Sequence, residues 1–517
     1  MRSLLMFGEE GWLGKWGFGI RIGWFFVKGR PMTSPQYASP ADFYKWYNEH
    51  VWLNGCDLGA EYRQAREEGR DLSTVEAEFK RLLAVPAPDE HWHGRVGGKR
   101  DVKWVAQAEA LIDKVNTLPY RKDFQYVEPS DLAGIKKARP QNVLMTGYTN
   151  ASKRLRSQLH GGLLGRICGC MLGKPVEGWR RDSIRTNAQE TDNWPLRGYW
   201  LQPLPAQARA IAKRKPHNQI NPDKHRTMLR YTINGMVEDD DINYTMVGFG
   251  ILKKHGADFT PLDVATFWGN NLPIFHTCTA ERVAYRNFVS GVLPPFSATY
   301  RNPYREWIGA QIRADFFGYA NPGLPERAAE WAWRDASISH VKNGIYGEMF
   351  VAAMIAAAYV MDKGNWLGVI NAGLAQIPAK CRLAEDVAYA INLHRQGLVH
   401  AAAVDHLHAR WDEKNHHDWC HTNSNAQVVV LALLYGKDDF AETVGRAVMA
   451  GFDTDCNGAT AGSLWGVMHG VDELPSGFTK PIGDLVRTGV TGYHEASVEK
   501  VAGEMSVLTL KMLAGGD

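Results

Sequence analysis

Two short acidic segments hold the residues of this sequence that are best suited to chemistry. Asp453 and Asp455 are separated by one residue in GFDTDC, and four carboxylates follow one another in the run EDDD at 238–241. One carboxylate is enough to cap a helix N-terminus, whereas two like charges about 4 Å apart repel by about 4 kcal/mol at an effective dielectric of 20. Two interpretations stay open: helix caps or solvated surface, or convergence of both segments on one hard cation. All-oxygen ligands favour Mg²⁺, Mn²⁺ or Ca²⁺ over zinc.

The residues after Asp455 predict a helix that another part of the chain approaches closely. Gly458, Gly462 and Gly466 recur every four residues, so they share one helical face. A glycine inside a helix costs about 1 kcal/mol relative to alanine. We therefore expect this face to allow close helix packing, and that packing to place the two aspartates.

The remaining pattern predicts an all-α fold. Residues 344–362 include an alanine-rich run that is apolar nearly all round, which indicates a helix buried on most sides. Residues 425–435 are typical of a helix that ends at Gly436. Alternating β-branched segments, which would indicate strands, are nearly absent. Helix ends must therefore position the acidic segments.

We predict three parts along the chain. The first is a disordered N-terminal extension over 1–40. Residues 41–117 contain three amphipathic helical patterns, and 118–150 contain three prolines typical of a linker. Residues 41–150 are therefore expected to form a helical module with its linker, and residues 151–517 the main domain.

The composition argues against several classes of protein. The 517 residues are 45% hydrophobic and 22% charged, with a net charge of +3, which gives no reason to expect a nucleic-acid partner. The seven cysteines form no C-x-x-C pair, so we expect the reducing cytoplasm rather than a disulfide scaffold. Charged residues interrupt the partly apolar N-terminus, so neither a signal peptide nor a membrane partner is expected.

A third segment, GRICGCMLGKPVE at 165–177, completes a pattern that resembles the ADP-ribosylglycohydrolase family. Members carry G-x-x-x-G-D-A-x-G-x-P-x-E, then T-D-D-T, then G-G-D-T-D-[ST], and here GRICGCMLGKPVE, EDDD and GFDTDC follow in that order. IGAQIRADFFGY is similar to the family's G-A-A-M-R-x-x-P-x-G and matches Arg313. SISH is similar to S-x-x-T-H and matches His340. The resemblance covers roughly residues 158–515.

The resemblance implies a compact, orthogonal all-α bundle with two magnesium ions in a central cleft, manganese being possible. The implied metal ligands are Glu238, Asp239, Asp240, Asp453 and Asp455. Asp240 or Glu177 would act as the catalytic base that takes a proton from the attacking water. The implied substrate-binding residues are Glu177, Arg313, His340 and Cys456.

Family members hydrolyse the bond between C1 of a ribose and its acceptor. The resemblance therefore predicts a metal-dependent glycoside hydrolase that acts on an ADP-ribosyl or related ribosyl compound, either a small molecule or linked to protein. Two alternatives are the hydrolysis of another N-ribosyl small molecule, and a catalytically silent member that binds ADP-ribose or has a structural role.

Four departures from the family pattern bear on these alternatives. Cys170 stands where the family has the aspartate of G-D-A, and Glu238 stands at the first threonine of T-D-D-T. Cys456 follows the D-x-D in place of serine or threonine, and Trp307 and Ile308 lie where the family has an asparagine. The retained Asp239, Asp240, Asp453 and Asp455 favour activity, and Glu238 adds a carboxylate that can compensate. Cys170, Cys456 and the lost asparagine favour silence.

Two further segments have competing interpretations. An insert at about 180–235 contains the basic residues Lys213, Arg214 and Lys215 and the aromatic residues Trp194, Tyr199 and Trp200. It predicts either a lid that contacts phosphates and stacks on a base, or a solvated loop. NHHDWCHTNSN contains His416, His417, Cys420 and His421, yet its spacing fits no zinc template, so we favour a structural or surface role. Two smaller features also stay open: Thr422–Asn425 as a helix cap or a substrate contact, and Glu348 as a buried acid or an ordinary helix residue.

Overall fold

The computed structural model describes residues 57–85, 102–140, 148, 152–201, 220 and 225–515, so the extension predicted over 1–40 lies outside them. The helices that precede the bundle are α2 (Leu58–Glu67), α3 (Glu76–Leu83), α4 (Val102–Val115) and α5 (Leu132–Ala138). Those of the bundle are α6 (Ser152–Gly173), α7 (Arg181–Glu190), α9 (Asp240–His255), α10 (Pro261–Asn271), α11 (Ala280–Val289), α12 (Asp315–Tyr319), α13 (Pro325–Ala336), α14 (Lys342–Ala358), α15 (Trp366–Leu374), α16 (Arg382–Arg395), α17 (His400–Arg410), α18 (His416–Cys420), α19 (Thr422–Tyr435), α20 (Phe440–Met449), α21 (Thr454–His469), α22 (Ser476–Ile482) and α23 (Val498–Leu513).

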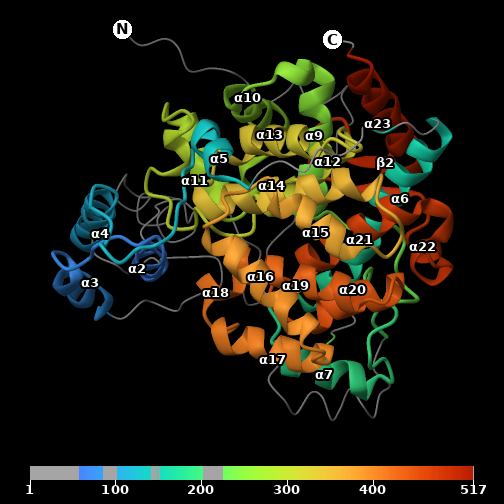
Figure 1. The fold of residues 1–517 in the computed structure, drawn as a ribbon, viewed down its shortest axis with the longest axis horizontal. Coiled ribbons are helices and arrows are strands. Elements are labelled where there is room, and N and C mark those ends of the chain that lie inside the picture. The colour runs from blue at the N-terminus through green and yellow to red at the C-terminus, as the bar shows by residue number, and fades with distance from the viewer. Residues whose placement is uncertain are drawn as a thin grey trace, which may run out of the picture.

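The predicted all-α fold is confirmed. Single 3-10 turns connect several helices: η1 (Lys174–Val176), η3 (Gly256–Asp258), η4 (Ile274–His276), η5 (Phe296–Ala298), η6 (Gln311–Arg313) and η7 (Val471–Glu473). Within the described ranges the only sheet is a two-stranded antiparallel pair of β1 (Leu485–Arg487) and β2 (Glu495–Ser497), in which Val486 is paired with Ala496. In Figure 1 the helices α14, α19 and α21 occupy the middle of the bundle.

The helices α14 and α19 form much of the buried core. Every residue of α14 is buried, which confirms the helix predicted over 344–362, although it ends at Ala358. The helix predicted over 425–435 begins three residues earlier, at Thr422, because His421 is its N-cap and accepts a hydrogen bond from the N–H of Asn423. Helices this apolar must be enclosed on all sides, so other helices surround both of them.

The glycine face of α21 packs on a second glycine face, that of α6. A Cβ atom added to Gly169 would lie 1.9 Å from the carbonyl oxygen of Gly458, and one added to Gly165 would lie 2.3 Å from that of Gly462. Gly173 meets Thr454 at one end, so the two helices run antiparallel. This contact confirms the expectation that the glycines allow another helix to approach.

We expect Gly462→Ala to lower the free energy of unfolding by about 1–3 kcal/mol, the usual cost of overpacking. The new methyl group would lie 2.2 Å from the carbonyl oxygen of Gly165, so the two backbones must separate. Urea denaturation followed by circular dichroism measures the change.

Gly269→Ala in α10 is the matched control, since no atom lies within 4 Å of its added Cβ. This control should raise the free energy of unfolding by about 0.5–1 kcal/mol, because alanine has a higher helix propensity than glycine. Equal effects of the two substitutions would contradict this account.

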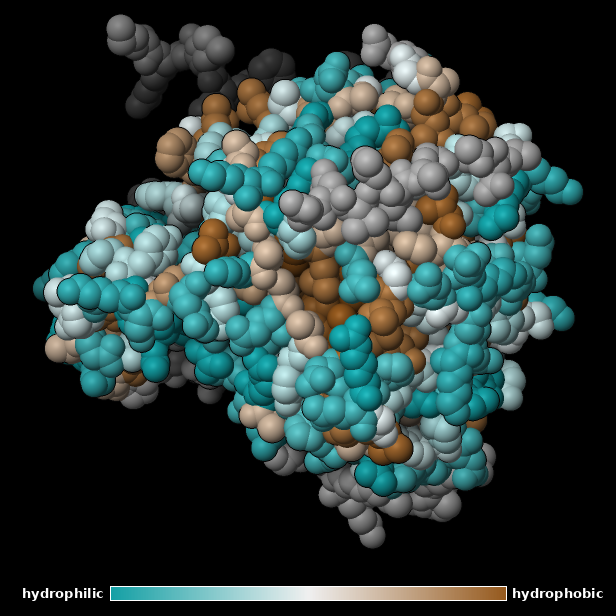
Figure 2. Space-filling view, viewed as in Figure 1, coloured by the Kyte–Doolittle hydropathy of each residue, from teal (hydrophilic) through white to brown (hydrophobic). Residues whose placement is uncertain are grey.

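The helices α2, α3 and α4 lie at one side of the bundle in Figure 1 and share a core of their own, which includes Phe79, Trp104 and Leu111. In the view of Figure 2 their surface is mostly hydrophilic, whereas hydrophobic residues gather in the middle of the neighbouring face of the bundle. The division into a 41–150 module and a 151–517 domain stays a prediction.

A buried charge network joins α2 to the bundle. The guanidinium of Arg305 donates to Glu61 Oε2 at 2.7 Å and, from Nε, to Glu68 Oε1 at 2.6 Å. The ammonium of Lys342 lies 3.2 Å from Glu68 Oε2. Burial raises the pKa of a carboxyl, but Arg305 and Lys342 outweigh burial at Glu68 and lower its pKa to about 2. Glu68 is therefore charged, and it ties α2 to the bundle.

No helix among the described residues combines the length and the apolar character needed to cross a bilayer.

Candidate active site

The candidate site lies where the end of α6 meets the beginnings of α9 and α21. Because α6 ends at Gly173 against Thr454, the turn η1 that follows it reaches the start of α21. Asp239 caps α9, and its carboxylate accepts a hydrogen bond from the N–H of Asp241. Arg166 of α6 fixes α9 by donating to the carbonyl oxygen of Asp241 at 2.8 Å and to its carboxylate at 3.1 Å.

The loop before α21 is positioned by α19. The side-chain oxygen of Asn425 accepts hydrogen bonds from the N–H of Asp453 at 3.1 Å and from the side chain of Asn457 at 2.7 Å. The hydroxyl of Thr422 donates to the carbonyl oxygen of Trp307 at 2.9 Å. The cap role left open for residues 422–425 is wrong, because they are the first four residues of α19 and His421 is its N-cap. The buried contacts of Thr422 and Asn425 are with the protein itself, Asn425 orients the aspartate loop, and a substrate contact stays a prediction.

The centre of the site is a lysine that sequence reasoning missed. The ammonium of Lys174 lies 2.7 Å from Glu177 Oε2, 2.6 Å from Asp239 Oδ2 and 3.3 Å from Asp455 Oδ2. These carboxylates come from three separate segments of the chain. The signal was available, since a lysine three residues before Glu177 stands inside the very motif that carried the resemblance.

The site holds more negative charge than the lysine balances. Burial opposes the charge on Lys174, but Asp239, Glu177 and Asp455 outweigh burial and raise its pKa well above the ordinary value. Burial, followed by the charge of Asp239, raises the pKa of Asp240 well above its ordinary value. Burial and Glu177 raise the pKa of Asp455 to about 7. Carboxylates that hold protons this strongly lack sufficient cationic partners.

Two groups of possible ligand atoms differ in how they are neutralised. Donor atoms of Cys170, Asp239 and Asp241 lie within 4.8 Å of one another, but Lys174 pairs with Asp239 and Arg166 pairs with Asp241. This α9 group therefore already has its cations.

The second group lies at the start of α21 and consists of Asp453, Asp455 and Cys456, whose donor atoms also lie within 4.8 Å of one another. The buried Oδ1 atom of Asp455 has no hydrogen-bond partner. Two adjacent carboxylates with a free oxygen fit a hard divalent cation, whereas the thiol of Cys456 is a poor ligand for magnesium. Residues of the α21 group thus fit the ion that the resemblance implies.

Glu238, the first residue of the acidic run, contacts Asn243 and His276. Its Oε1 atom accepts a hydrogen bond from Asn243 at 2.8 Å and lies 2.6 Å from Nδ1 of His276. Glu238 precedes Asp239, which has extended backbone angles, and successive side chains of extended backbone point to opposite sides. Glu238 therefore has different contacts from Asp239. These contacts give no support to the predicted role of Glu238 as a metal ligand.

The predicted substrate contacts Arg313 and His340 are both 1% exposed. Arg313 donates to Glu281 at 2.7 Å and to Asp335, and lies 3.5 Å from Glu348. Of the two roles left open for Glu348, the structure shows the buried acid. Nδ1 of His340 lies 2.8 Å from the hydroxyl of Ser339. In this conformation neither side chain is accessible, and their assignment to substrate binding stays a prediction.

The aromatic residues of the insert belong to the bundle core. Tyr199 and Trp200 are completely buried: the hydroxyl of Tyr199 donates to the carbonyl oxygen of Phe478 at 3.1 Å, and the indole of Trp200 donates to that of Leu172 at 2.9 Å. The suggestion that these two rings stack on a substrate base is therefore wrong. The basic residues at 213–215 lie outside the described part of the chain, so the lid itself stays a prediction.

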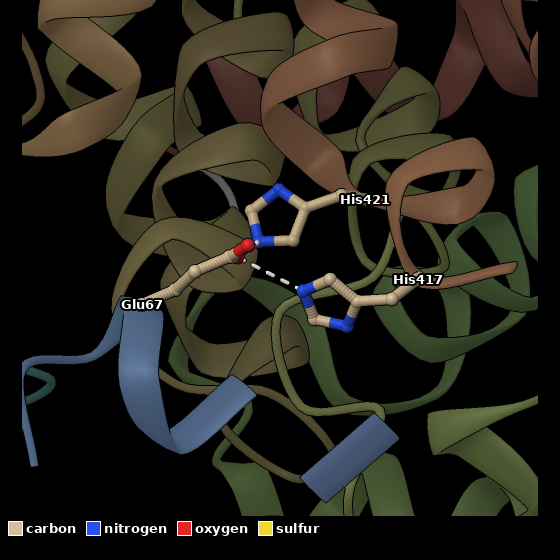
Figure 3. A group of neighbouring side chains, drawn as sticks. All are labelled: Glu67, His417 and His421. Atoms are coloured by element: carbon tan, nitrogen blue, oxygen red, sulfur yellow. Dashed lines mark hydrogen bonds and ion pairs between the residues drawn. The ribbon is translucent and has the colours of Figure 1, made fainter. Parts of the chain in front are cut away.

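A cluster of two histidines and a carboxylate connects α2 with α18 (Figure 3). Nε2 of His417 lies 2.9 Å from Glu67 Oε2, and Nε2 of His421 lies 3.7 Å from the same oxygen. Nε2 of His421 is also 3.5 Å from Glu306 Oε2. The composition of this cluster suggests a metal site.

The hydrogen-bond network argues against a metal in that cluster. The indole N–H of Trp307 donates to Nδ1 of His417 at 3.1 Å, and the backbone N–H of Asn423 donates to Nδ1 of His421 at 3.0 Å. An imidazole that accepts at Nδ1 carries its proton on Nε2, so both Nε2–H groups face carboxylates. Metal ligation at Nε2 would move each proton to Nδ1, directly against an N–H donor. The network therefore favours the structural role expected for His417 and His421.

The comparisons with known proteins give the family of this all-α chain, whose acidic cluster lies at helix ends. The family model described as ADP-ribosylglycohydrolase matches residues 151–507. The chain belongs to the ADP-ribosylglycohydrolase family, as the resemblance predicted, and this membership supports a general role in glycosidic hydrolysis.

No curated protein matches the chain. Among solved structures it is similar to one titled "ADP-ribosylglycohydrolase-related protein complex", with 17% sequence identity and a TM-score of 0.41. The similarity covers 70% of this chain and 99% of the other.

Proposed function

We propose that this chain hydrolyses the glycosidic bond between C1 of a ribose and its acceptor, in an ADP-ribosyl or related ribosyl compound. The observation that carries the proposal is the meeting of Glu177, Asp239 and Asp455 around Lys174, with Asp240 and Asp453 beside them. Family membership supports the reaction class, and the site supplies the acids that this class of reaction uses.

Asp453 and Asp455 would hold a divalent cation, magnesium or manganese, and the charge of Asp455 also acts on Asp240. When bound, such an ion supplies positive charge that lowers the pKa of a water molecule.

The other steps depend on the chain's own carboxylates. Asp240 remains partly exposed, and burial together with the charge of Asp239 raises its pKa well above the ordinary value, so Asp240 is the first candidate for the base that takes a proton from the water that attacks the anomeric carbon. Glu177 is also partly exposed and is held by Lys174, which makes it the second candidate base. The surplus of negative charge would stabilise the positive charge that develops on the ribose ring in the transition state.

The test is product analysis. The chain is incubated in magnesium with ADP-ribosylated peptides and, separately, with a panel of nucleosides, and the products are separated by liquid chromatography and identified by mass spectrometry. Release of free ADP-ribose from the peptides supports the proposal. Cleavage of nucleosides alone would replace it with the hydrolysis of another N-ribosyl small molecule.

A silent, ADP-ribose-binding role is the second candidate. It is favoured by the protein cation Lys174 among the acids and by the thiols of Cys170 and Cys456 at positions where the family pattern has oxygen ligands. Under this alternative, calorimetry shows that ADP-ribose binds while product analysis shows no cleavage of any substrate in the panel.

A further inference from the structure

The two acidic groups of the site have unequal access to protein cations. In the α9 group, Asp239 contacts the ammonium of Lys174 and Asp241 contacts the guanidinium of Arg166. In the α21 group, Lys174 lies 3.3 Å from Asp455 Oδ2, and the buried Oδ1 atom of the same carboxylate has no partner. The lysine therefore stands between the two groups: its shorter contact, 2.6 Å, is the ion pair with Asp239 of the first group, and it also donates a hydrogen bond to Asp455 of the second.

We propose that the ammonium of Lys174 occupies one of the two cation positions of this site, so that the chain binds one divalent ion fewer than its carboxylates could hold. The inference rests on the proposed function and deepens it, because it concerns the same site. The remaining ion would bind at Asp453 and Asp455.

The geometry of Lys174 is that of a tethered cation. Three carboxylates, from Glu177, Asp239 and Asp455, lie within 3.3 Å of its nitrogen: the ammonium donates hydrogen bonds to Glu177 and Asp455 and forms an ion pair with Asp239. An ammonium is a compact point charge on a flexible stem, so it can take a position that a small cation would otherwise fill. Because these contacts hold the side chains of Glu177 and Asp239 in place, Lys174 is a positioning residue for both.

A tethered ammonium differs from a divalent ion in two respects. It carries one positive charge instead of two, so it neutralises less of the charge of the surrounding carboxylates than a divalent ion would. It also cannot dissociate, so Asp239 and Glu177 remain fixed when the ion bound at the α21 group leaves.

The test counts bound ions in the wild type, Lys174→Met and Lys174→Arg by calorimetry with magnesium and by electron paramagnetic resonance with manganese. Met keeps most of the side-chain stem and removes the charge, whereas Arg keeps the charge. We expect Lys174→Met to bind one ion more than the wild type, and Lys174→Arg to bind the same number as the wild type. Equal counts for the wild type and Lys174→Met would overturn the inference.

A folding control keeps the test decisive. If Lys174→Met folds only with the extra ion, its melting temperature rises with magnesium concentration more steeply than that of the wild type, which supports the inference. Failure of magnesium to restore the fold of Lys174→Met would count against it. The outcome is independent of turnover: an extra ion in Lys174→Met without any hydrolysis by the wild type would sink the proposed function and leave the role of Lys174 intact.

Discussion

Asp455→Asn is expected to reduce ribosyl hydrolysis by at least about 100-fold, the loss typical of removing one charged group from an active site. Asp455 contacts Lys174 with one oxygen and leaves the other buried and unpartnered, so it is both a support for the lysine and a candidate ligand. The substitution removes the charge without changing the size of the side chain. The measurement is kcat/KM for whichever ribosyl substrate the product analysis identifies.

The control for this variant is Asp472→Asn, which changes an exposed aspartate in η7 of the same chain. Its turnover should equal that of the wild type, and the circular dichroism spectra of both variants should match the wild-type spectrum. Wild-type turnover by Asp455→Asn in saturating magnesium would mean that the reaction does not use this site.

Arg305→Met should lower the free energy of unfolding by about 3–5 kcal/mol, the cost of leaving buried charges without their partner. Arg305 is 2% exposed and is held between Glu61 and Glu68 of the N-terminal part. Without the guanidinium, Glu61 has no cation at hydrogen-bonding distance among the contacts described here, and Glu68 keeps only Lys342 and a distant Arg70. Urea denaturation followed by tryptophan fluorescence measures the loss.

The matched control is Arg81→Met in α3. Arg81 pairs with Glu78 at 3.8 Å, and 58% of its side-chain surface is exposed, so its removal should change stability by less than about 1 kcal/mol. If Arg305→Met were as mild as this control, the network would not be what fixes α2 to the bundle.

The glycine pattern shows how much could be predicted from the sequence. The four-residue spacing of Gly458, Gly462 and Gly466 was enough to predict close helix packing, since a helix tolerates such residues only for a reason. The partner was readable too: Gly161, Gly165, Gly169 and Gly173 have the same spacing in α6. Matching the two stripes would have predicted that α6 and α21 pair, whereas the antiparallel order that brings η1 to the aspartate loop is seen only in the structure.

Other features of the structure depend on contacts between residues that are far apart in the sequence, which a local pattern cannot predict. The direction of the Glu238 side chain is decided by His276, which is 38 residues away, and by the beginning of α9. The partners of Arg305 are Glu61 and Glu68, more than 230 positions earlier in the chain. A sequence motif identified the acids, but it could not show which of them a lysine neutralises.

The pairing of α6 with α21 also has a consequence for how this chain is made. Gly173 and Thr454, which touch at the end of that pair, are 281 positions apart. At about 5–20 residues per second, a ribosome needs roughly 15–60 s to synthesise the intervening chain. Throughout that time the glycine face of α6 lacks the helix that packs on it, and a helix with so many glycines is weak alone. The acidic centre is therefore incomplete on the nascent chain until Asp455, which lies in the last eighth of the sequence, has emerged.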